Sequence, residues 1–313
     1  MVTQAGKISV RPIVDNPLEL VFNTPMVRLQ KVVETGSADV VAKLEGSNPT
    51  GSVKDRVCLG TIRAAEKEGK LKKGYTIIEP TGGNTGVSLA MTAAVLGYDL
   101  ILVMPENVPD EQKALLESYG AKLELTPSSG GMPAAIKTAR EIFSQKNTKK
   151  SFMLNQFENP LNPETHKRTT AVEILEATGG EIDAFVAGVG TGGTISGVGE
   201  VLRAEIPSAQ VVAVEPKNSA VISGGEPGAH RIHGLGAGFL PKLLNRDTID
   251  RVVTVSDDEA LEMTHRLARE EGLVVGISSG AAAFVSVMIA RELGKGKRVV
   301  TIFPDRGEKY VSR

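Results

Sequence analysis

The sequence has few of the residues that crosslink proteins or bind nucleic-acid bases. Among its 313 residues there is one cysteine, Cys58, there is no tryptophan, and aromatic residues make up 4%. A single cysteine cannot form an internal disulfide and leaves no cysteine cluster for zinc, which suits a reducing cytoplasm. Scarce aromatic residues argue against a protein that stacks the bases of single strands.

An excess of charge of one sign and long apolar runs are missing as well. Lys plus Arg number 36 and Asp plus Glu number 37, so no long-range field favours nucleic acid or an anionic membrane. Apolar stretches such as VSLAMTAAVLGY are too short to span a membrane, and the first twelve residues lack the apolar part of a signal peptide. We therefore expect a cytoplasmic protein with no nucleic-acid or membrane partner. Hydrophobic residues make up 41% of the sequence, which is enough for a full core.

The sequence does contain a regular alternation of strand and helix patterns. Strands joined by helical crossovers predict an α/β fold whose parallel sheet is covered on both faces. A capping box at Ser256 and Glu259 marks the start of one further helix. The expected strands are 75–79, 100–104, 122–125, 184–189 and 211–215, and the expected helices include 87–96, 111–119, 132–143 and 195–204.

A glycine-rich segment at 188–194 follows the apolar run AFVAGV and precedes a helical pattern. Backbone N–H groups at a helix start are unpaired and the helix dipole favours an anion, so this corner suits a phosphate. A tight turn that needs positive φ is the alternative. The segment also satisfies G-x-G-x-x-G, and Glu215 ends the next strand, as in a dinucleotide site. From this segment alone, a nicotinamide-dependent oxidoreductase remains an alternative function.

Lys54 lies in the segment EGSNPTGSVKDR at 45–56, where a helix is expected to begin. Ser52 is predicted to cap that helix, which places Lys54 in its first turn. The positive end of the helix dipole disfavours an ammonium ion and lowers its pKa, as an imine-forming amine requires. An isolated lysine is usually a solvated side chain, but the neighbouring Gly, Asn and Pro residues indicate a shaped loop.

Two further segments stand between a strand and a helix. Residues 81–86, TGGNTG, offer backbone N–H groups, an amide and two hydroxyls to a carboxylate or phenolate, and a helix cap by Asn or Thr is the alternative. Residues 276–280, GISSG, match the nucleophile elbow of serine hydrolases, but no histidine follows Ser278, which argues against a hydrolase. The alternative there is that a serine caps the helix. His230 and His233 lack the cysteines or carboxylate pair of a zinc site.

Together these segments resemble the cysteine synthase (O-acetylserine sulfhydrylase) family of fold-type-II pyridoxal-phosphate enzymes. The resemblance extends from Asn23 to Ser312, and five motifs in this order are far more specific than any one of them. The motifs are NPTGSVKDR at 48–56, EPTGGNTG at 79–86, GTGGTISG at 190–197, HGLGAGFLP at 233–241 and EGLVVGISSGAA at 271–282.

The resemblance implies an α/β fold with two lobes, each a mainly parallel twisted sheet with helices on both faces. The N-terminal lobe would comprise residues 46–155, and the C-terminal lobe residues 1–45 plus 156–313. Lys54 is implied as the Schiff-base lysine, Asn84 as the partner of the ring hydroxyl and Ser278 as the partner of the pyridine nitrogen. The resemblance also implies a phosphate cup at Gly190, Thr191, Gly192, Gly193 and Thr194, a substrate-carboxylate seat at Thr81, Gly82, Asn84, Thr85 and Gln156, an active-site loop at Gly234, and no metal.

The implied activity is a pyridoxal-phosphate-dependent β-replacement. Sulfide would replace the acetoxy group of O-acetyl-L-serine through an aminoacrylate, giving L-cysteine and acetate. A serine partner at the ring nitrogen suits this reaction, because a hydroxyl leaves the ring a weaker electron sink than a carboxylate does. O-phosphoserine sulfhydrylase and a cystathionine β-synthase-like enzyme are the alternatives within this mechanism. A homodimer and a serine acetyltransferase partner are also implied.

Gly82 departs from the family pattern, which usually has serine at this position. One carboxylate contact is therefore expected to be missing or to come from the backbone. The segments EGSNPTGSVKDR and FPDRGEKY resemble the B-type isozyme, whereas GAGFLP and ISGGEPGAHRI resemble the A-type. The sequence leaves both types open.

Overall fold

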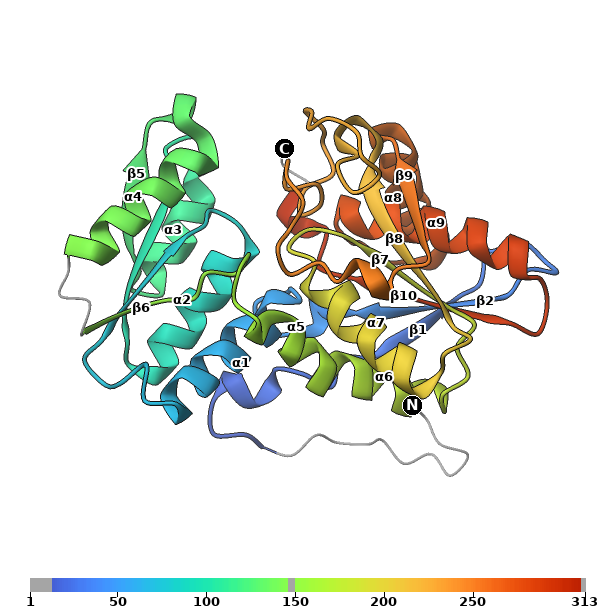
Figure 1. The fold of residues 1–313 in the computed structure, drawn as a ribbon, viewed down its shortest axis with the longest axis horizontal. Coiled ribbons are helices and arrows are strands. Elements are labelled where there is room, and N and C mark those ends of the chain that lie inside the picture. The colour runs from blue at the N-terminus through green and yellow to red at the C-terminus, as the bar shows by residue number, and fades with distance from the viewer. Residues whose placement is uncertain (1–12, 146–149, 311–313) are drawn as a thin grey trace.

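The computed structural model describes residues 13–145 and 150–310, which form two lobes, each built on one sheet (Figure 1). The smaller sheet has the order β5-β4-β3-β6, and all its neighbouring strands are parallel. This sheet and its helices make up the blue-green half of the molecule. Its strands are β3 (Thr76–Pro80), β4 (Asp99–Pro105), β5 (Lys122–Thr126) and β6 (Ser151–Met153), and its helices are α1 (Lys54–Lys67), α2 (Asn84–Leu96), α3 (Asp110–Ser118) and α4 (Gly131–Gln145).

Alternate side chains of the central strands cover the two faces of the smaller sheet. Ile77 and Leu102 pack with α1, α2 and α3, whereas Ile78 and Val103 pack with α4. Because side chains alternate along a strand, consecutive apolar residues are expected where both faces are covered. The helices therefore sandwich this sheet, as the sequence pattern predicts.

The larger sheet has the order β1-β2-β10-β7-β8-β9, and β1 with β2 is its antiparallel pair. Helices α8 and α9 pack on one face, and α6 and α7 on the other. Figure 1 shows the blue strands β1 and β2 in this lobe beside the red strand β10. The strands are β1 (Met26–Leu29), β2 (Asp39–Leu44), β7 (Ala184–Gly188), β8 (Gln210–Pro216), β9 (Arg251–Val255) and β10 (Arg298–Phe303), and the helices are α5 (Leu161–His166), α6 (Val172–Thr178), α7 (Gly193–Glu205), α8 (Asp257–Glu271) and α9 (Ile277–Leu293).

The predicted α/β fold with mainly parallel sheets is confirmed. The five expected strands are found within one residue of their expected bounds, and Ser256 and Glu259 form the expected capping box. Helices α2 and α7 begin earlier than predicted, at Asn84 and Gly193, because glycine and threonine hide the apolar periodicity of the first turn. The glycine motifs thus supply the first turns of these helices.

The segments that carry the candidate site follow the carboxyl ends of parallel strands. Residues 81–83 follow β3, residues 189–192 follow β7, and residues 304–310 follow β10. In open α/β sheets this edge is where ligands bind. Within residues 13–145 and 150–310, no helix combines the length and apolar content needed to cross a bilayer.

Candidate active site

Lys54 is the first residue of α1, and the loop before it pairs with the C-terminal segment. Val53 donates its N–H to the carbonyl oxygen of Pro304 at 2.8 Å, and Ser52 forms an isolated bridge with Asp305. The predicted cap by Ser52 is wrong. Val53 occupies the N-cap position with helical dihedral angles, and the buried Ser52 Oγ has no hydrogen-bond partner among the described residues. Pairing with the C-terminal segment fixes the start of α1 instead.

The amine of Lys54 is half-buried and forms no hydrogen bond or ion pair with the described part of the chain. Burial lowers the pKa of Lys54, and the neighbouring Cys58 and Asp305 oppose this effect. The direction agrees with the prediction from the sequence, but burial rather than the helix dipole is the main cause. A lysine with a lowered pKa keeps more of its amine neutral, which is the form that attacks a carbonyl or takes up a proton.

Asp55 ties the Lys54 loop to α2. Its carboxylate accepts a hydrogen bond from the Thr50 N–H at 2.8 Å and another from Ser88 Oγ at 2.5 Å. Burial raises the pKa of Asp55, and the hydrogen bonds from Ser88 and Thr50 oppose this rise. The loop of Lys54 is therefore held against the helix that begins with Asn84.

Asn84 is the first residue of α2, and its side chain contacts the C-terminal segment. Its Nδ2 donates to Asp305 Oδ2 at 2.7 Å, and its Oδ1 accepts a hydrogen bond from Lys309 Nζ at 2.8 Å. The helix has Gly83 at its N-cap and no side-chain cap, so the alternative that Asn or Thr caps it is wrong. The amide of Asn84 therefore binds the C-terminal segment and is not used as a helix cap.

Thr85 and Gln156, both predicted at the substrate-carboxylate seat, lie in contact. Thr85 Oγ1 donates to Gln156 Oε1 at 2.7 Å. The buried carboxylate of Glu79 accepts the N–H of Gln156 at 3.2 Å and that of Asn155 at 2.8 Å. Asn155 has a φ of 53°, a left-handed conformation that Glu79 holds in place. Burial raises the pKa of Glu79 to about 7, and backbone hydrogen bonds including those from Asn155 and Gln156 oppose this rise.

Gly82 lies where the side chain of Val108 fills the space that a larger residue would need. A Cβ on Gly82 would lie 2.6 Å from Val108 Cγ2. The carbonyl oxygen of Gly82 accepts a hydrogen bond from Gln112 Nε2, and the Gly83 N–H donates to Thr81 Oγ1 at 3.3 Å. Glycine at this position is therefore matched to its surroundings.

The turn between β7 and α7 is packed too closely for side chains. A Cβ on Gly190 would lie 2.2 Å from the carbonyl oxygen of Gly234, and one on Gly193 would lie 1.9 Å from Asn162 Oδ1. Gly192 has a φ of 84°, so the tight-turn alternative holds for that residue. Helix α7 has no side-chain cap at Gly192, and the Gly193 N–H makes only a long hydrogen bond of 3.4 Å to Thr191 Oγ1, so N–H groups of this first turn can bind an anion.

The two threonines of this turn are both held by buried side chains. Asn162 Nδ2 donates to Thr191 Oγ1 at 3.0 Å. Thr194 Oγ1 lies 3.2 Å from His166 Nε2, and His166 Nδ1 lies 2.8 Å from Thr170 Oγ1. Burial lowers the pKa of His166 well below its ordinary range, so the imidazole is neutral. A neutral ring can accept from Thr170 and donate to Thr194, which leaves the Thr194 hydroxyl hydrogen for a ligand.

Ser278 is buried in the first turn of α9, and its hydroxyl has no hydrogen-bond partner within the described residues. The N-cap of α9 is Gly276 without a side-chain cap, so the alternative that a serine caps this helix is wrong. A Cβ on Gly276 would lie 2.1 Å from Asp305 Oδ1. Asp305 therefore lies between Asn84 and the helix of Ser278.

Gly234 belongs to a loop that lies against the turn between β7 and α7. Its φ is 89°, and the Gly236 N–H donates to the carbonyl oxygen of Val189 at 3.1 Å. His233, next to Gly234, stacks on Tyr310 with ring centroids 5.7 Å apart. The loop thus contacts both the glycine-rich turn and the C-terminal segment.

Glu215, the acid of the dinucleotide alternative, is turned into the protein. It is 1% exposed, and its carboxylate accepts hydrogen bonds from the N–H groups of Ile222 and Ser223 at 2.8 and 3.0 Å. Ser223 Oγ donates to it as well, at 2.5 Å. A carboxylate occupied in this way cannot bind a ribose hydroxyl, so the structure argues against the nicotinamide alternative.

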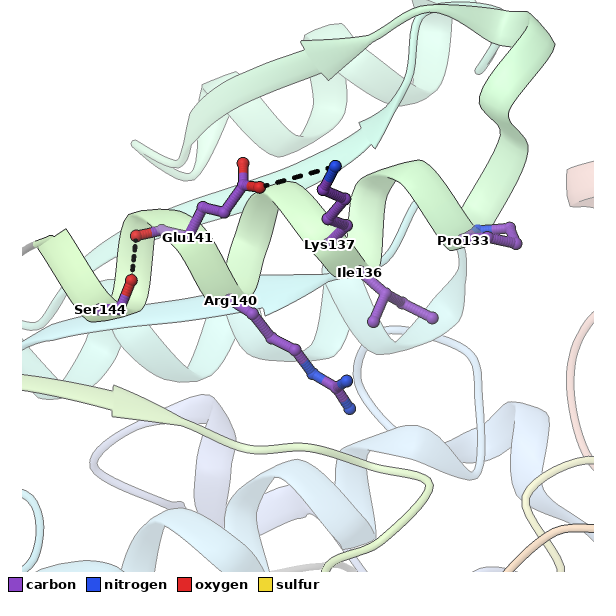
Figure 2. A pocket seen from close by; sticks show the side chains of 6 residues that line it. All are labelled: Pro133, Ile136, Lys137, Arg140, Glu141 and Ser144. Carbon is purple, nitrogen blue, oxygen red and sulfur yellow. Dashed lines mark hydrogen bonds and ion pairs between the residues drawn. The ribbon is translucent and has the colours of Figure 1, made fainter.

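Two hollows lie near α4. Figure 2 shows the first, which has a volume of about 400 Å³. Lys137 pairs with Glu141 there, and Ser144 donates to the Glu141 carbonyl. These side chains do not form a recognisable catalytic arrangement. In Figure 2, Ile136 and Arg140 extend from the other side of α4. Both also line the second hollow, of about 240 Å³, which Gln156 lines as well. The second hollow is lined by Glu79, Pro80, Ile136, Arg140, Met153, Asn155, Gln156, Phe157, Glu158, Phe239, Leu240 and Lys242.

Comparison with known proteins identifies the family. A family model described as pyridoxal-phosphate dependent enzyme matches residues 18–305. The chain belongs to this family. It is 52% identical to a cysteine synthase of Staphylococcus aureus over 300 residues, and the matched region covers 96% of each chain. Ser312, where the resemblance in the sequence ends, lies outside the described residues.

Solved structures of the family have the same fold. The crystal structure of a cysteine synthase from Entamoeba histolytica superposes with a TM-score of 0.93 at 38% identity, covering 98% of this chain and 93% of that one. An O-acetylserine dependent cystathionine beta-synthase from Helicobacter pylori gives a TM-score of 0.91 at 38% identity, covering 97% and 99%. The protein is a pyridoxal-phosphate-dependent enzyme.

The side chains and turns of the candidate site fit this cofactor. The glycine turn leads into a helix start without a side-chain cap, where a phosphate can bind backbone N–H groups. The amine of Lys54 and the hydroxyl of Ser278, neither of which has a hydrogen-bond partner in the described part of the chain, are groups that a bound ring and aldehyde can use. Sequence reasoning missed Asp305, Lys309, Glu79 and Asn162, whose contacts all depend on tertiary structure.

Proposed function

We propose that this chain is a cysteine synthase that replaces the acetoxy group of O-acetyl-L-serine with sulfide, releasing L-cysteine and acetate. The main support is the 52% identity to a cysteine synthase over 96% of both chains. The lowered pKa of Lys54, the shared neighbour Asp305 of Lys54 and Asn84, and the uncapped start of α7 agree with this activity.

Four helix starts would hold the cofactor, those of α1, α2, α7 and α9. Lys54 would bind it covalently, Asn84 would donate to its ring hydroxyl, and Ser278 would face its pyridine nitrogen. The first turn of α7, with its N–H groups and the Thr194 hydroxyl, would bind the phosphate. In full, the proposed cofactor ligands are Lys54, Asn84, Gly190, Thr191, Gly192, Gly193, Thr194 and Ser278.

The substrate carboxylate would bind at the corner between β3 and α2. Thr81 offers a hydroxyl and Gln156 an amide there, and Thr85 orients Gln156 by donating to its Oε1. Gly82, Asn84 and Thr85 would contribute backbone N–H groups at the start of α2. Glu79 fixes the backbone at Gln156 by accepting its N–H. The hollow beside Gln156 would admit O-acetylserine from solvent.

Lys54 would also move the α-proton. Pyridoxal phosphate, when bound, withdraws electrons from the α-carbon of an amino acid and so weakens its C–H bond. The burial that lowers the pKa of Lys54 favours the neutral amine that can take this proton. The acetoxy group then leaves from the β-carbon, and sulfide adds there.

The remaining expectations are part of the same proposal. We propose lobes of residues 46–155 and of 1–45 plus 156–313, supported by the two separate sheets; residues 1–12, 146–149 and 311–313 lie outside the described residues. A homodimer, a serine acetyltransferase partner and a cytoplasmic location follow from the family resemblance and the single cysteine. Light scattering of the enzyme alone and mixed with a serine acetyltransferase would test the two assemblies.

One experiment tests the reaction directly. The purified enzyme loaded with cofactor is mixed with O-acetylserine, first without and then with sulfide. The visible absorption of the cofactor is expected to change with O-acetylserine and to return when sulfide is added, with one cysteine and one acetate released per turnover. If O-phosphoserine or serine produces the change and O-acetylserine does not, the proposed donor is wrong.

A second candidate function uses the same donor with a different thiol. The structural likeness to an O-acetylserine dependent cystathionine beta-synthase favours this alternative. The same assay with homocysteine in place of sulfide separates the two functions. Cysteine synthase activity predicts a clearly higher kcat/KM for sulfide than for homocysteine.

A further inference from the structure

The C-terminal segment contacts the side-chain amide of Asn84 at both of its polar atoms. Asp305 Oδ2 accepts from Asn84 Nδ2 at 2.7 Å, and Lys309 Nζ donates to Asn84 Oδ1 at 2.8 Å. A carboxylate accepts hydrogen bonds and an ammonium ion donates them, so this pair permits one orientation of the amide. An amide nitrogen has two N–H donors, and Asp305 uses one of them. The second donor remains for another partner.

Asp305 is itself held in place from several sides. It is 4% exposed, and Tyr310 Oη donates to its Oδ2 at 2.6 Å. Its backbone carbonyl accepts the N–H of Gly276 at 3.2 Å, next to α9. Its Oδ1 is buried and has no hydrogen-bond partner among the described residues. This carboxylate therefore has a fixed position between two elements of the candidate site.

Lys309 is anchored in the same way. Besides Asn84, it donates to the carbonyl oxygen of Thr50 at 3.0 Å, in the loop that leads to Lys54. Its ammonium group is half-buried. Asn84 and Asp305 lie 221 positions apart in the chain, so the contact exists only when both lobes are folded.

We propose that Asp305 and Lys309 are positioning residues that fix the amide of Asn84, so that its second N–H points to the ring hydroxyl of pyridoxal phosphate. This inference rests on the role proposed above for Asn84. The two residues act through Asn84 and take no part in the reaction themselves.

The test measures cofactor binding in the absence of any substrate, so its outcome does not depend on which amino acid the enzyme uses. Cofactor affinity and the visible spectrum are compared for the unmodified enzyme, Asp305→Ala, Asp305→Asn, Asn84→Ala and the double variant Asp305→Ala/Asn84→Ala. Asp305→Asn keeps a hydrogen-bond acceptor of the same shape. Glu308→Gln is the matched control, because Glu308 is exposed in the same turn and does not contact Asn84.

Asp305→Ala is expected to weaken cofactor binding by about tenfold and to shift the visible spectrum, as losing an outer partner of a ligand-binding side chain commonly does. Asp305→Asn should lose about threefold or less, and Glu308→Gln should bind normally. In the Asn84→Ala background, Asp305→Ala should have no further effect, because coupled residues are not additive.

Two results would overturn the proposal. One is that Asp305→Ala lowers stability but leaves affinity and spectrum unchanged, which would give Asp305 a purely structural role. The other is that the effects of Asp305→Ala and Asn84→Ala add, which would mean that Asp305 acts independently of Asn84. If Asp305→Ala does not fold, the same cycle with Lys309→Met decides between these outcomes.

Discussion

Among single residues, Lys54 and Lys217 offer a direct contrast, since both follow loop-forming residues. Lys54 is half-buried with a lowered pKa, whereas Lys217 is exposed just after β8. An exposed side chain in water lacks the shaped loop that surrounds Lys54, so Lys217 is a weaker candidate for binding a cofactor. The surroundings of the two side chains therefore separate the candidate from its nearest competitor.

Lys54→Ala is expected to abolish the visible absorption of tightly held cofactor and to lower turnover by at least about 10²-fold, because a general base alone contributes about 10²–10⁴. Absorption after gel filtration and a cysteine-formation assay measure these effects. Lys217→Ala should retain both properties. Normal absorption and activity in Lys54→Ala would disprove its assignment.

Gly82→Ser restores the residue usual in the family, but it is expected to destabilise this chain. The new Cβ would lie 2.6 Å from Val108 Cγ2, and β-branched valine has little freedom to turn away. Overpacking of this kind costs about 1–3 kcal/mol, measured by denaturant unfolding. In a Val108→Ala background, Gly82→Ser should cost much less stability, because the smaller alanine leaves room for the new side chain. The double variant should therefore be nearly as stable as Val108→Ala alone. A single variant as stable as the unmodified chain would show that the site accommodates serine.

The start of α7 is the element proposed to bind the phosphate. Its N–H groups are supplied by a glycine turn, and Thr194 is supported by His166. The N–H groups come from the backbone, so most side-chain changes in the turn act by blocking access. Thr194 is different, because its hydroxyl is itself a donor.

Thr194→Val is expected to weaken cofactor binding by roughly ten- to a hundredfold, since a hydrogen bond to a charged group contributes about 1.5–3 kcal/mol. Thr169→Val is the control: Thr169 Oγ1 bonds the carbonyl of Thr165, so the same chemical change is made outside the turn. Equilibrium dialysis of the cofactor compares them. Equal affinities for Thr194→Val and the control would remove Thr194 from the phosphate site.

The elements could be predicted from the sequence more completely than the site. Runs such as LILVM at 100–104 specify buried strands through local composition, so their bounds are correct within one residue. The cap at Ser52 was wrong because residues 304–306, far away in the chain, pair with that loop. Asp305 and Glu79 have no local signal either, since each acts on a residue more than seventy positions away. The assigned roles of Lys54, Asn84 and Ser278 stay predictions.

Across the whole molecule, buried charge joins the two halves. Arg56 of α1 binds Glu45 at 2.6 Å and Glu173 of α6 at 2.6 Å, and Lys43 of β2 binds Glu173 at 2.7 Å. Burial alone would raise the pKa of Glu173, but Arg56 and Lys43 lower it to about 2. Its stabilising effect is therefore present above its ordinary pKa of 4.5 and is lost as the pH falls through about 2.

Glu79 has the opposite effect on stability. Burial raises its pKa from 4.5 to about 7, so its contribution is fully present below 4.5 and is lost as the pH rises through about 7. Glu79→Gln, which imitates the neutral acid, should flatten the decline of the unfolding free energy between about pH 5 and about pH 8. Denaturant titrations with cofactor bound measure this decline. Glu117→Gln, at an exposed position, should not flatten it, and an equal slope in Glu79→Gln would contradict the raised pKa.

The position of β10 has a consequence for folding during translation. This strand lies between β2 and β7 but comes after every other strand of residues 13–145 and 150–310. During synthesis, the four strands of the smaller sheet, β3 to β6, emerge from the ribosome one after another. They can pair early, because domains fold as units during synthesis. The larger sheet must wait with its centre open until residues 298–303 arrive, followed directly by Asp305. A product that stops before residue 298 would lack a central strand and a contact of Asn84, so cofactor capture should come only after residue 305 has emerged from the ribosome.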